Sequence, residues 1–167
     1  MIRIMAAFLF TAAGTAAGIS LSLRLKEERE LCREIGEVFR SSALQIRYRG
    51  MDVYELSSEL KCKSGLDNLT FIKELPDRYR CGENFHVLWK NALDNQPRLP
   101  DEERRLLSRF GELLGTSDVD GQLASIAVLE EELSGLEAKR NDNYHRKGKL
   151  FRCVGVLAGA MTGILVI

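Results

Sequence analysis

The chain has 167 residues, which is enough for one domain with a modest core. Its 24 Lys and Arg residues balance its 24 Asp and Glu residues, so it lacks the basic excess that a nucleic-acid-binding protein needs. Three prolines and 7% aromatic residues, with no long alternation of β-branched residues, indicate an all-α fold.

The first predicted element is apolar, because residues 4–23 include no charged side chain. About 20 residues at 1.5 Å each match the roughly 30 Å hydrocarbon core of a bilayer. We therefore expect a transmembrane helix over residues 1–24. A cleaved signal peptide is the alternative, since small side chains are frequent in residues 11–17.

A bundle of about six helices is expected over residues 25–149. The first helix continues beyond the apolar segment on an apolar stripe of Leu31, Ile35, Val38 and Phe39. Asp52 and Glu55 stand at the spacing of a capping box and predict the start of a second short helix. A third helix is expected from the spacing of Leu66, Leu69, Ile72 and Leu75, ended by Pro76.

Three further helices complete the predicted bundle. Asn84 can cap the fourth, in which Trp89 is expected to anchor the core. After a loop over residues 95–100, a fifth helix carries Asp101, Glu102 and Glu103 in its first turn, where the helix dipole favours negative charge. The sixth is long, with an apolar stripe at Leu123, Ile126, Leu129, Leu133 and Leu136.

A second apolar segment, residues 150–167, ends the chain and is expected to attach it to the same membrane. Its uncharged part spans only about 15 residues, or roughly 22 Å of helix, so full spanning requires Arg152 to snorkel. Lys and Arg residues gather on the inner flank of both apolar segments. This asymmetry predicts that residues 25–149 lie in the cytoplasm.

Small residues recur within both apolar segments. Gly14 and Gly18 are four residues apart, as are Gly155, Gly159 and Gly163. Such spacing lets membrane helices approach closely, although apolar sequences rich in Gly and Ala also produce it by chance. We expect the two stripes to pack against each other in an intramolecular hairpin, with contact between copies of the chain as the alternative.

The connection between the last two bundle helices is a tight turn. Gly115 stands where a helix ends in the left-handed conformation, and the polar residues after it can cap the next helix. The sequence of this stretch resembles the signature of the stage III sporulation protein AB family. The residues that carry the resemblance are Phe110, Gly111, Leu114, Gly115, Ser117, Asp118 and Gln122. The glycine-rich apolar tail and the run from Trp89 to Leu93 are also similar to that family.

The resemblance implies a membrane platform of the channel assembled between mother cell and forespore, located in the mother-cell membrane that faces the forespore. The family's bundle is similar to the cytoplasmic domain of the inner-membrane platform protein of type II secretion and type IV pilus systems. By that likeness the partners are a cytoplasmic secretion-type ATPase and other sporulation-channel proteins. A signalling or regulatory adaptor tethered to the membrane, and a secreted helical protein, are the alternatives.

No catalytic constellation emerges from the sequence, so we expect a protein that is not an enzyme and has no cofactor. His86 and His145 lack metal-ligand spacing, and neither a nucleophile elbow nor a complete phosphate-binding loop is present. The cysteines lack C-x-x-C spacing, which favours thiols over disulfides. Glu130, Glu131 and Glu132 are a candidate partner surface, although such a run is usually the solvated face of a helix.

Overall fold

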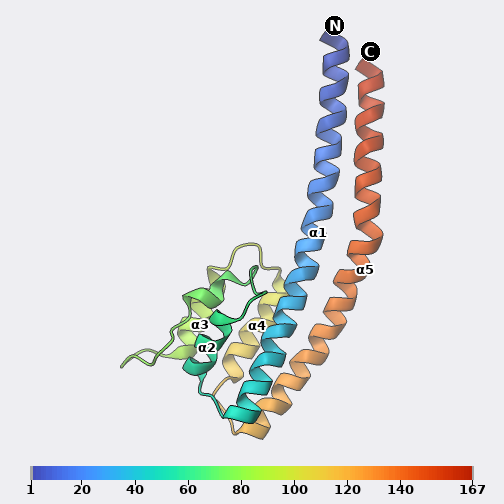
Figure 1. Ribbon diagram of the computed structural model, residues 1–167. Helices are drawn as coiled ribbons and strands as arrows, with labels where there is room; N and C mark the ends of the chain where they lie inside the picture. Colours follow the sequence, from blue (N-terminus) through green and yellow to red (C-terminus); the bar gives the residue numbers. More distant parts are fainter. Residues whose placement is uncertain (1, 167) are drawn as a thin grey trace. The chain divides into compact units, whose positions relative to one another are not determined.

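The computed structural model describes the backbone of residues 2–166, and all side chains except those of residues 1–8, 10, 11, 151, 152, 155, 156, 158–160 and 162–167. The described chain contains five α-helices, one 3-10 helix and no strand, which confirms the all-α fold. In chain order these are α1 (Ile2–Arg49), α2 (Val53–Cys62), the 3-10 helix η1 (Thr70–Glu74), α3 (Phe85–Asp94), α4 (Asp101–Leu113) and α5 (Val119–Val166) (Figure 1).

The chain divides into two compact units. Met1–Arg29 and Ala138–Ile167 form the first, which we call the paired-helix unit, and Glu30–Glu137 form the second, which we call the bundle unit. Residues 25–29 and 138–149, expected to belong to the bundle, therefore lie in the paired-helix unit.

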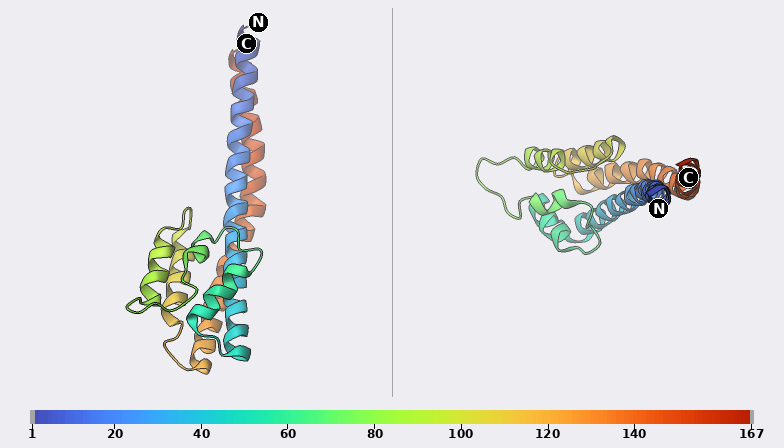
Figure 2. Two further views of the ribbon diagram at one scale, coloured as in Figure 1. Left: turned by 60° about the vertical axis from the view of Figure 1, so that its left-hand side comes forward. Right: turned by 90° about the horizontal axis from the view of Figure 1, so that it is seen from above.

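Within the paired-helix unit, the parts of α1 and α5 that it contains run side by side in opposite directions (Figures 1 and 2). Arg140 Nη1 donates to Glu28 Oε2 at 3.2 Å, and the guanidinium of Arg29 lies 4.8 Å from the centre of the Tyr144 ring. A Cβ atom added to Gly148 would lie 3.4 Å from Ser22 Oγ. These contacts fix the register of the two helices from Ser22 to Arg29.

Among the described residues, no helical stretch is both long enough and apolar enough to span a bilayer. Both expected anchors, residues 1–24 and 150–167, include positions whose side chains lie outside the described residues. Membrane attachment at the two ends therefore stays a prediction.

The second helix of the bundle unit begins as the sequence predicted. Asp52 Oδ1 accepts hydrogen bonds from the backbone N–H groups of Tyr54 and Glu55, both at 2.8 Å. The Glu55 side chain accepts a hydrogen bond from the Asp52 N–H at 3.4 Å, which completes the capping box. Asn84 likewise caps α3 by accepting from the N–H of His86 at 2.9 Å.

The third predicted helix is wrong in type and extent, because only Thr70–Glu74 is helical and its geometry is 3-10. Leu66, Leu69, Ile72 and Leu75 are all buried, so their spacing reports a core face. The backbone is held differently, since the N–H of Asn68 donates to Glu34 and that of Phe71 donates to Gln96. These bonds to distant side chains replace the bonds that a continuous α-helix would form.

The core of the bundle unit gathers around aromatic rings from three helices. Phe39 of α1 stacks on Phe110 of α4 with ring centres 4.7 Å apart. Trp89 of α3 lies 5.6 Å from Phe110, is only 2% exposed and donates its indole N–H to the carbonyl of Leu107 at 2.9 Å. Trp89 is therefore the core anchor that the sequence predicted.

Candidate functional site

The turn between α4 and α5 is held together by one glutamine side chain. Gly115 has a φ of +72°, which confirms the predicted left-handed residue at the helix end. Its N–H donates to Gln122 Oε1 at 3.2 Å, and Gln122 Nε2 donates to the carbonyl of Ser117 at 2.8 Å. The amide of Gln122 thus fixes both halves of the turn.

Asp118 starts α5 as its N-cap, since its Oδ1 accepts from the N–H of Gly121 at 3.1 Å. A Cβ atom at Gly121 would lie 2.7 Å from Asp118 Oδ1 and 3.0 Å from Ser117 Oγ. Only glycine fits there without a shift of the cap. Gly121 was not among the residues predicted from the sequence, although its place three residues after a capping aspartate was a usable signal.

The remaining signature residues lie in the core. Phe110 and Leu114 are buried, and Gly111 lies directly against the indole of Trp89. A Cβ atom at Gly111 would come within 2.2 Å of Trp89 Cδ1. The carbonyl of Gly111 lies 2.8 Å from His86 Nδ1, so this ring nitrogen carries the proton that it donates.

The contacts of the seven signature residues are therefore internal to the bundle unit. They set the angle between two helices and place α3 against α4. This arrangement leaves the outward-facing side chains of α4 and of residues 119–137 exposed.

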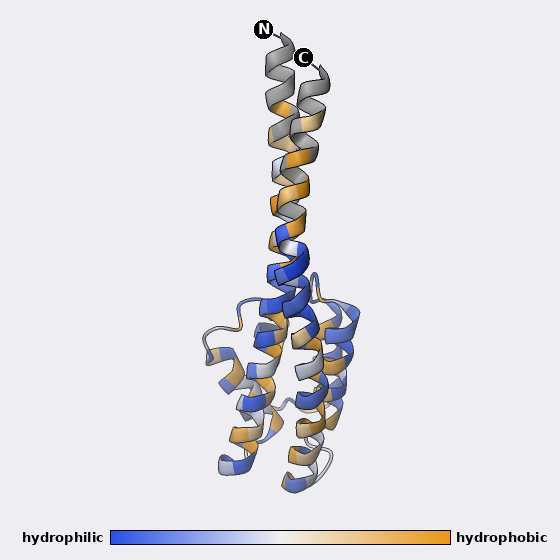
Figure 3. Cartoon of the chain, turned by 90° about the vertical axis from the view of Figure 1, so that its right-hand side faces the viewer, coloured by the Kyte–Doolittle hydropathy of each residue, from blue (hydrophilic) through white to orange (hydrophobic). Residues whose placement is uncertain are grey.

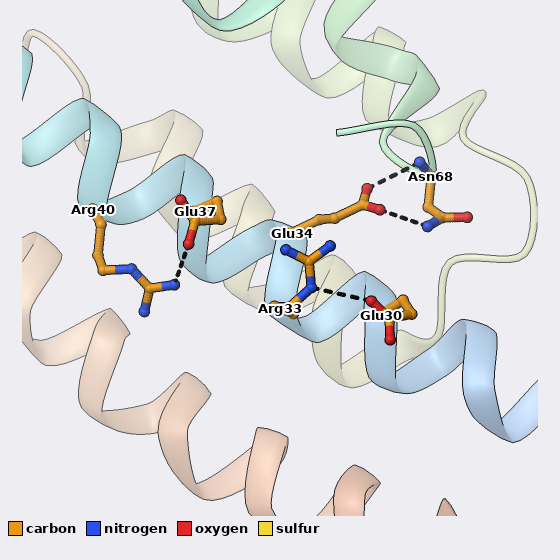
Figure 4. Close-up of polar contacts among 6 residues, drawn as sticks. All are labelled: Glu30, Arg33, Glu34, Glu37, Arg40 and Asn68. Atoms are coloured by element: carbon orange, nitrogen blue, oxygen red, sulfur yellow. Dashed lines mark hydrogen bonds and ion pairs between the residues drawn. The ribbon is translucent and has the colours of Figure 1, made fainter. Parts of the chain in front are cut away.

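A buried polar network that was not predicted from the sequence links three elements of the bundle unit. Glu34 of α1 is only 3% exposed and accepts from the backbone N–H of Asn68 at 2.9 Å and from Asn68 Nδ2 at 2.6 Å (Figure 4). Burial raises the pKa of Glu34, and the hydrogen bonds from Asn68 oppose that rise.

Gln96, which follows α3, completes this network. Its Oε1 accepts from Thr70 Oγ1 at 3.0 Å and from the N–H of Phe71 at 2.9 Å, while its Nε2 donates to the carbonyl of Asn68 at 2.8 Å. The network therefore fastens the 3-10 helix to α1 and to the end of α3. Its role is to hold the bundle in one packing arrangement.

A second buried polar contact joins α1 to α4. The thiol of Cys32 donates to Glu103 Oε1 at 3.3 Å, and both side chains are fully buried. Glu103 was expected only to place charge in the first turn of its helix, and it does stand there. The thiols of Cys62, Cys81 and Cys153 are exposed.

Exposed ion pairs line the outer side of α1 in the bundle unit. Arg33 pairs with Glu30 at 3.1 Å and Arg40 with Glu37 at 2.8 Å (Figure 4). The guanidinium of Arg40 lowers the pKa of Glu37. Such exposed pairs are each worth about 0–1 kcal/mol, so their main effect is on the charge of the surface.

The expected partner surface lies on α5. Glu131 and Glu132 are exposed and Glu130 is half-buried. Glu132 pairs with Arg109 of α4 at 2.5 Å, whereas Glu131 makes no hydrogen bond or ion pair with the described residues. Residues 119–137 contain five acidic side chains and no Lys or Arg. This part of α5 is therefore negatively charged.

The expected contact between the glycine stripes of the two apolar segments falls only partly on the described residues. Gly18 is buried and Gly14 is half-buried in the paired-helix unit, on the side of α1 that also carries the buried Ser22. The side-chain positions of Gly155, Gly159 and Gly163 lie outside the described residues. Their packing against Gly14 and Gly18 stays a prediction.

The described residues include no group of three His, Cys, Asp or Glu side chains placed to hold a metal ion. The family model described as stage III sporulation protein AB matches residues 3–167. Comparison with curated proteins and with solved structures gave no match.

Proposed function

We propose that this chain, which belongs to the stage III sporulation protein AB family, is a membrane platform that assembles other proteins by contact and catalyses no reaction itself. The family gives it a role in stage III of sporulation. Our proposal places it in the mother-cell membrane that faces the forespore, with residues 25–149 in the cytoplasm. Its partners there are other proteins of the sporulation channel and a cytoplasmic secretion-type ATPase.

The observation that supports the membrane location is the exposure of large apolar side chains in the described parts of residues 9–23 and 150–161. Soluble proteins seldom expose apolar surface of this extent, whereas lipid tails solvate it at no cost. The exposed side chains come from both helices of the unit: Leu9, Ile19, Leu21, Leu23, Leu150, Val154, Leu157 and Met161.

The orientation is supported by charge. Most Lys and Arg residues of this unit follow the apolar part of α1 or precede residues 150–167, and only Arg3 stands on the outer flank of the first apolar segment, which is the distribution expected when the inner flanks lie on the cytoplasmic side of a membrane. Activity reporters fused to either terminus should therefore report from outside the cytoplasm. One inserted in residues 95–100 should report from inside.

The partner contact is supported by the acidic face of α5, on which Glu131 is exposed and makes no hydrogen bond or ion pair with the described residues. A basic surface on the ATPase would complement it and speed the encounter. The test is co-purification of the tagged full-length protein from sporulating cells, with Glu131→Lys as the variant. Glu74→Lys is the matched control, because Glu74 is also exposed but lies on η1.

We expect Glu131→Lys to lower the recovered ATPase several-fold and Glu74→Lys to leave it unchanged, with equal thermal stability for both variants. Equal recovery with both variants would show that the acidic face of α5 does not bind the ATPase. If another soluble protein is recovered and no ATPase, the signalling or regulatory adaptor becomes the better description.

A further inference from the structure

The balanced charge of the whole chain conceals a separation of charge between the two units. The paired-helix unit has ten Lys and Arg residues against three Asp and Glu residues, a net charge of +7. The bundle unit has 14 Lys and Arg residues against 21 Asp and Glu residues, a net charge of −7. The two charges cancel in the sum, so the composition of the chain does not reveal them.

The exposed positive charge of the paired-helix unit is concentrated over a short length of both helices. We call the exposed side chains of Arg24, Lys26, Arg146, Lys147 and Lys149 the basic collar. The contacts Ser22–Gly148 and Glu28–Arg140 enclose four of the five residues, and Lys149 directly follows Gly148. The collar residues of α1 and α5 therefore lie at about the same level of the helix pair.

Part of the collar is neutralised within the protein. Arg146 pairs with Asp142 at 3.0 Å, and Arg24 lies 3.9 Å from Glu28, which also accepts from Arg140. Lys26, Lys147 and Lys149 are different, because they make no hydrogen bond or ion pair with the described residues. Three exposed ammonium groups are therefore available to a negatively charged partner.

The apolar side chains of the same unit indicate which partner this is. Leu21 and Leu23 precede the collar on α1, while Leu150 and Val154 follow it on α5, and all four are about half exposed. On both helices, going from the chain end towards the bundle unit, exposed apolar residues come first and exposed basic residues second. The orange and blue parts of the helix pair show this order (Figure 3). A bilayer presents the complementary order, hydrocarbon and then phosphate.

We propose that the basic collar binds the phosphate groups of anionic phospholipids, so that the protein selects anionic over zwitterionic lipid at its membrane boundary. The inference rests on the proposed membrane location and adds the lipid class. Each basic residue close to an anionic surface strengthens association by about fivefold, and this effect decays over about one Debye length. Lysine suits the task because its long stem lets the ammonium reach the headgroups.

The test measures lipid selectivity of the full-length protein in bilayers. Spin-labelled phosphatidylglycerol and spin-labelled phosphatidylcholine serve as probes, and the ratio of their association constants with the protein is the readout. We expect the wild-type protein to prefer phosphatidylglycerol about three- to tenfold, and this preference should fall as sodium chloride is raised.

The variant Lys26→Gln, Lys147→Gln, Lys149→Gln should bring the ratio close to one. Its matched control is Arg47→Gln, Lys73→Gln, Lys90→Gln, which removes the same charge from exposed positions of the bundle unit and should leave the ratio at the wild-type value.

Three results would overturn the inference while leaving the membrane platform intact. These are an equal preference for both lipids, an unchanged preference in the collar variant, and a preference abolished by inorganic phosphate but not by chloride at equal ionic strength. The last would identify a site for free anions. Failure of the wild-type protein to associate with bilayers of either lipid would instead refute the proposed function.

Discussion

Gly111 offers the sharpest test of the packing between α3 and α4. Alanine normally stabilises the interior of a helix by about 0.5–1 kcal/mol relative to glycine. At Gly111, however, the added Cβ would come within 2.2 Å of Trp89 Cδ1 and 2.3 Å of Trp89 Nε1. The indole cannot retreat without losing its hydrogen bond to Leu107 and its place among buried rings. We expect Gly111→Ala to lower the free energy of unfolding by about 1–3 kcal/mol.

The bundle unit reports its own unfolding, because Trp89 is the only tryptophan of the chain. Thermal unfolding of the full-length protein in mild detergent, followed by its fluorescence, should show a midpoint lower by about 4–8 °C per kcal/mol. Gly135→Ala is the matched control, since Gly135 is exposed on α5 with nothing within 4 Å of an added Cβ, so its midpoint should rise. If both variants shift the midpoint upward, the close contact of Gly111 with Trp89 does not exist.

Three further substitutions test the turn, the helix pair and the buried carboxylate. Gly115→Val should lower the free energy of unfolding by about 1 kcal/mol or more, because φ of Gly115 is +72° and an added Cβ would lie 3.2 Å from Val53. An unchanged unfolding midpoint would rule out the left-handed turn. We expect a disulfide within one chain when Ser22→Cys and Gly148→Cys are combined in a chain without its native cysteines. Disulfides only between chains would contradict the pairing of α1 with α5 in one molecule. Burial raises the pKa of Glu34 in the fold, so the wild type should gain stability relative to Glu34→Gln as the pH falls from 7 towards 4.5. Parallel pH profiles of the two proteins would show that this pKa is not raised.

Features that depend on neighbours in the sequence could be predicted from it. The capping box of Asp52 and Glu55 joins residues three apart, and the left-handed Gly115 follows directly from the end of an apolar stripe. Trp89 was predicted as a core anchor because its own helix has a clear apolar face. In each case the physical cause lies within one turn of helix, which a single sequence displays.

Features that depend on distant partners could not be predicted in this way. Glu34 and Asn68 are 34 residues apart, and neither residue type nor spacing indicates their pairing. The same pairing explains the failure over residues 66–75, where the apolar periodicity of a helix was present but the backbone bonds go to Glu34 and Gln96. Gly111 was recognised as part of a family signature. The reason that glycine is required there, the nearby indole of Trp89, becomes visible only when α3 and α4 are packed together.

The charge separation between the two units is present in the sequence, but the net charge of the whole chain does not reveal it. Residues 24–29 and 138–149 are separated by more than a hundred positions, so no window along the chain includes both basic flanks. The contact of Arg140 with Glu28 brings them to one level, and the division into units assigns the compensating acids elsewhere. If both proposals hold, the basic collar would meet the lipid headgroups while the acidic residues of α5 would meet a basic protein. Lipid selection and partner binding would then draw on one arrangement of charge, and weakening the first by salt should leave the fold of the bundle intact.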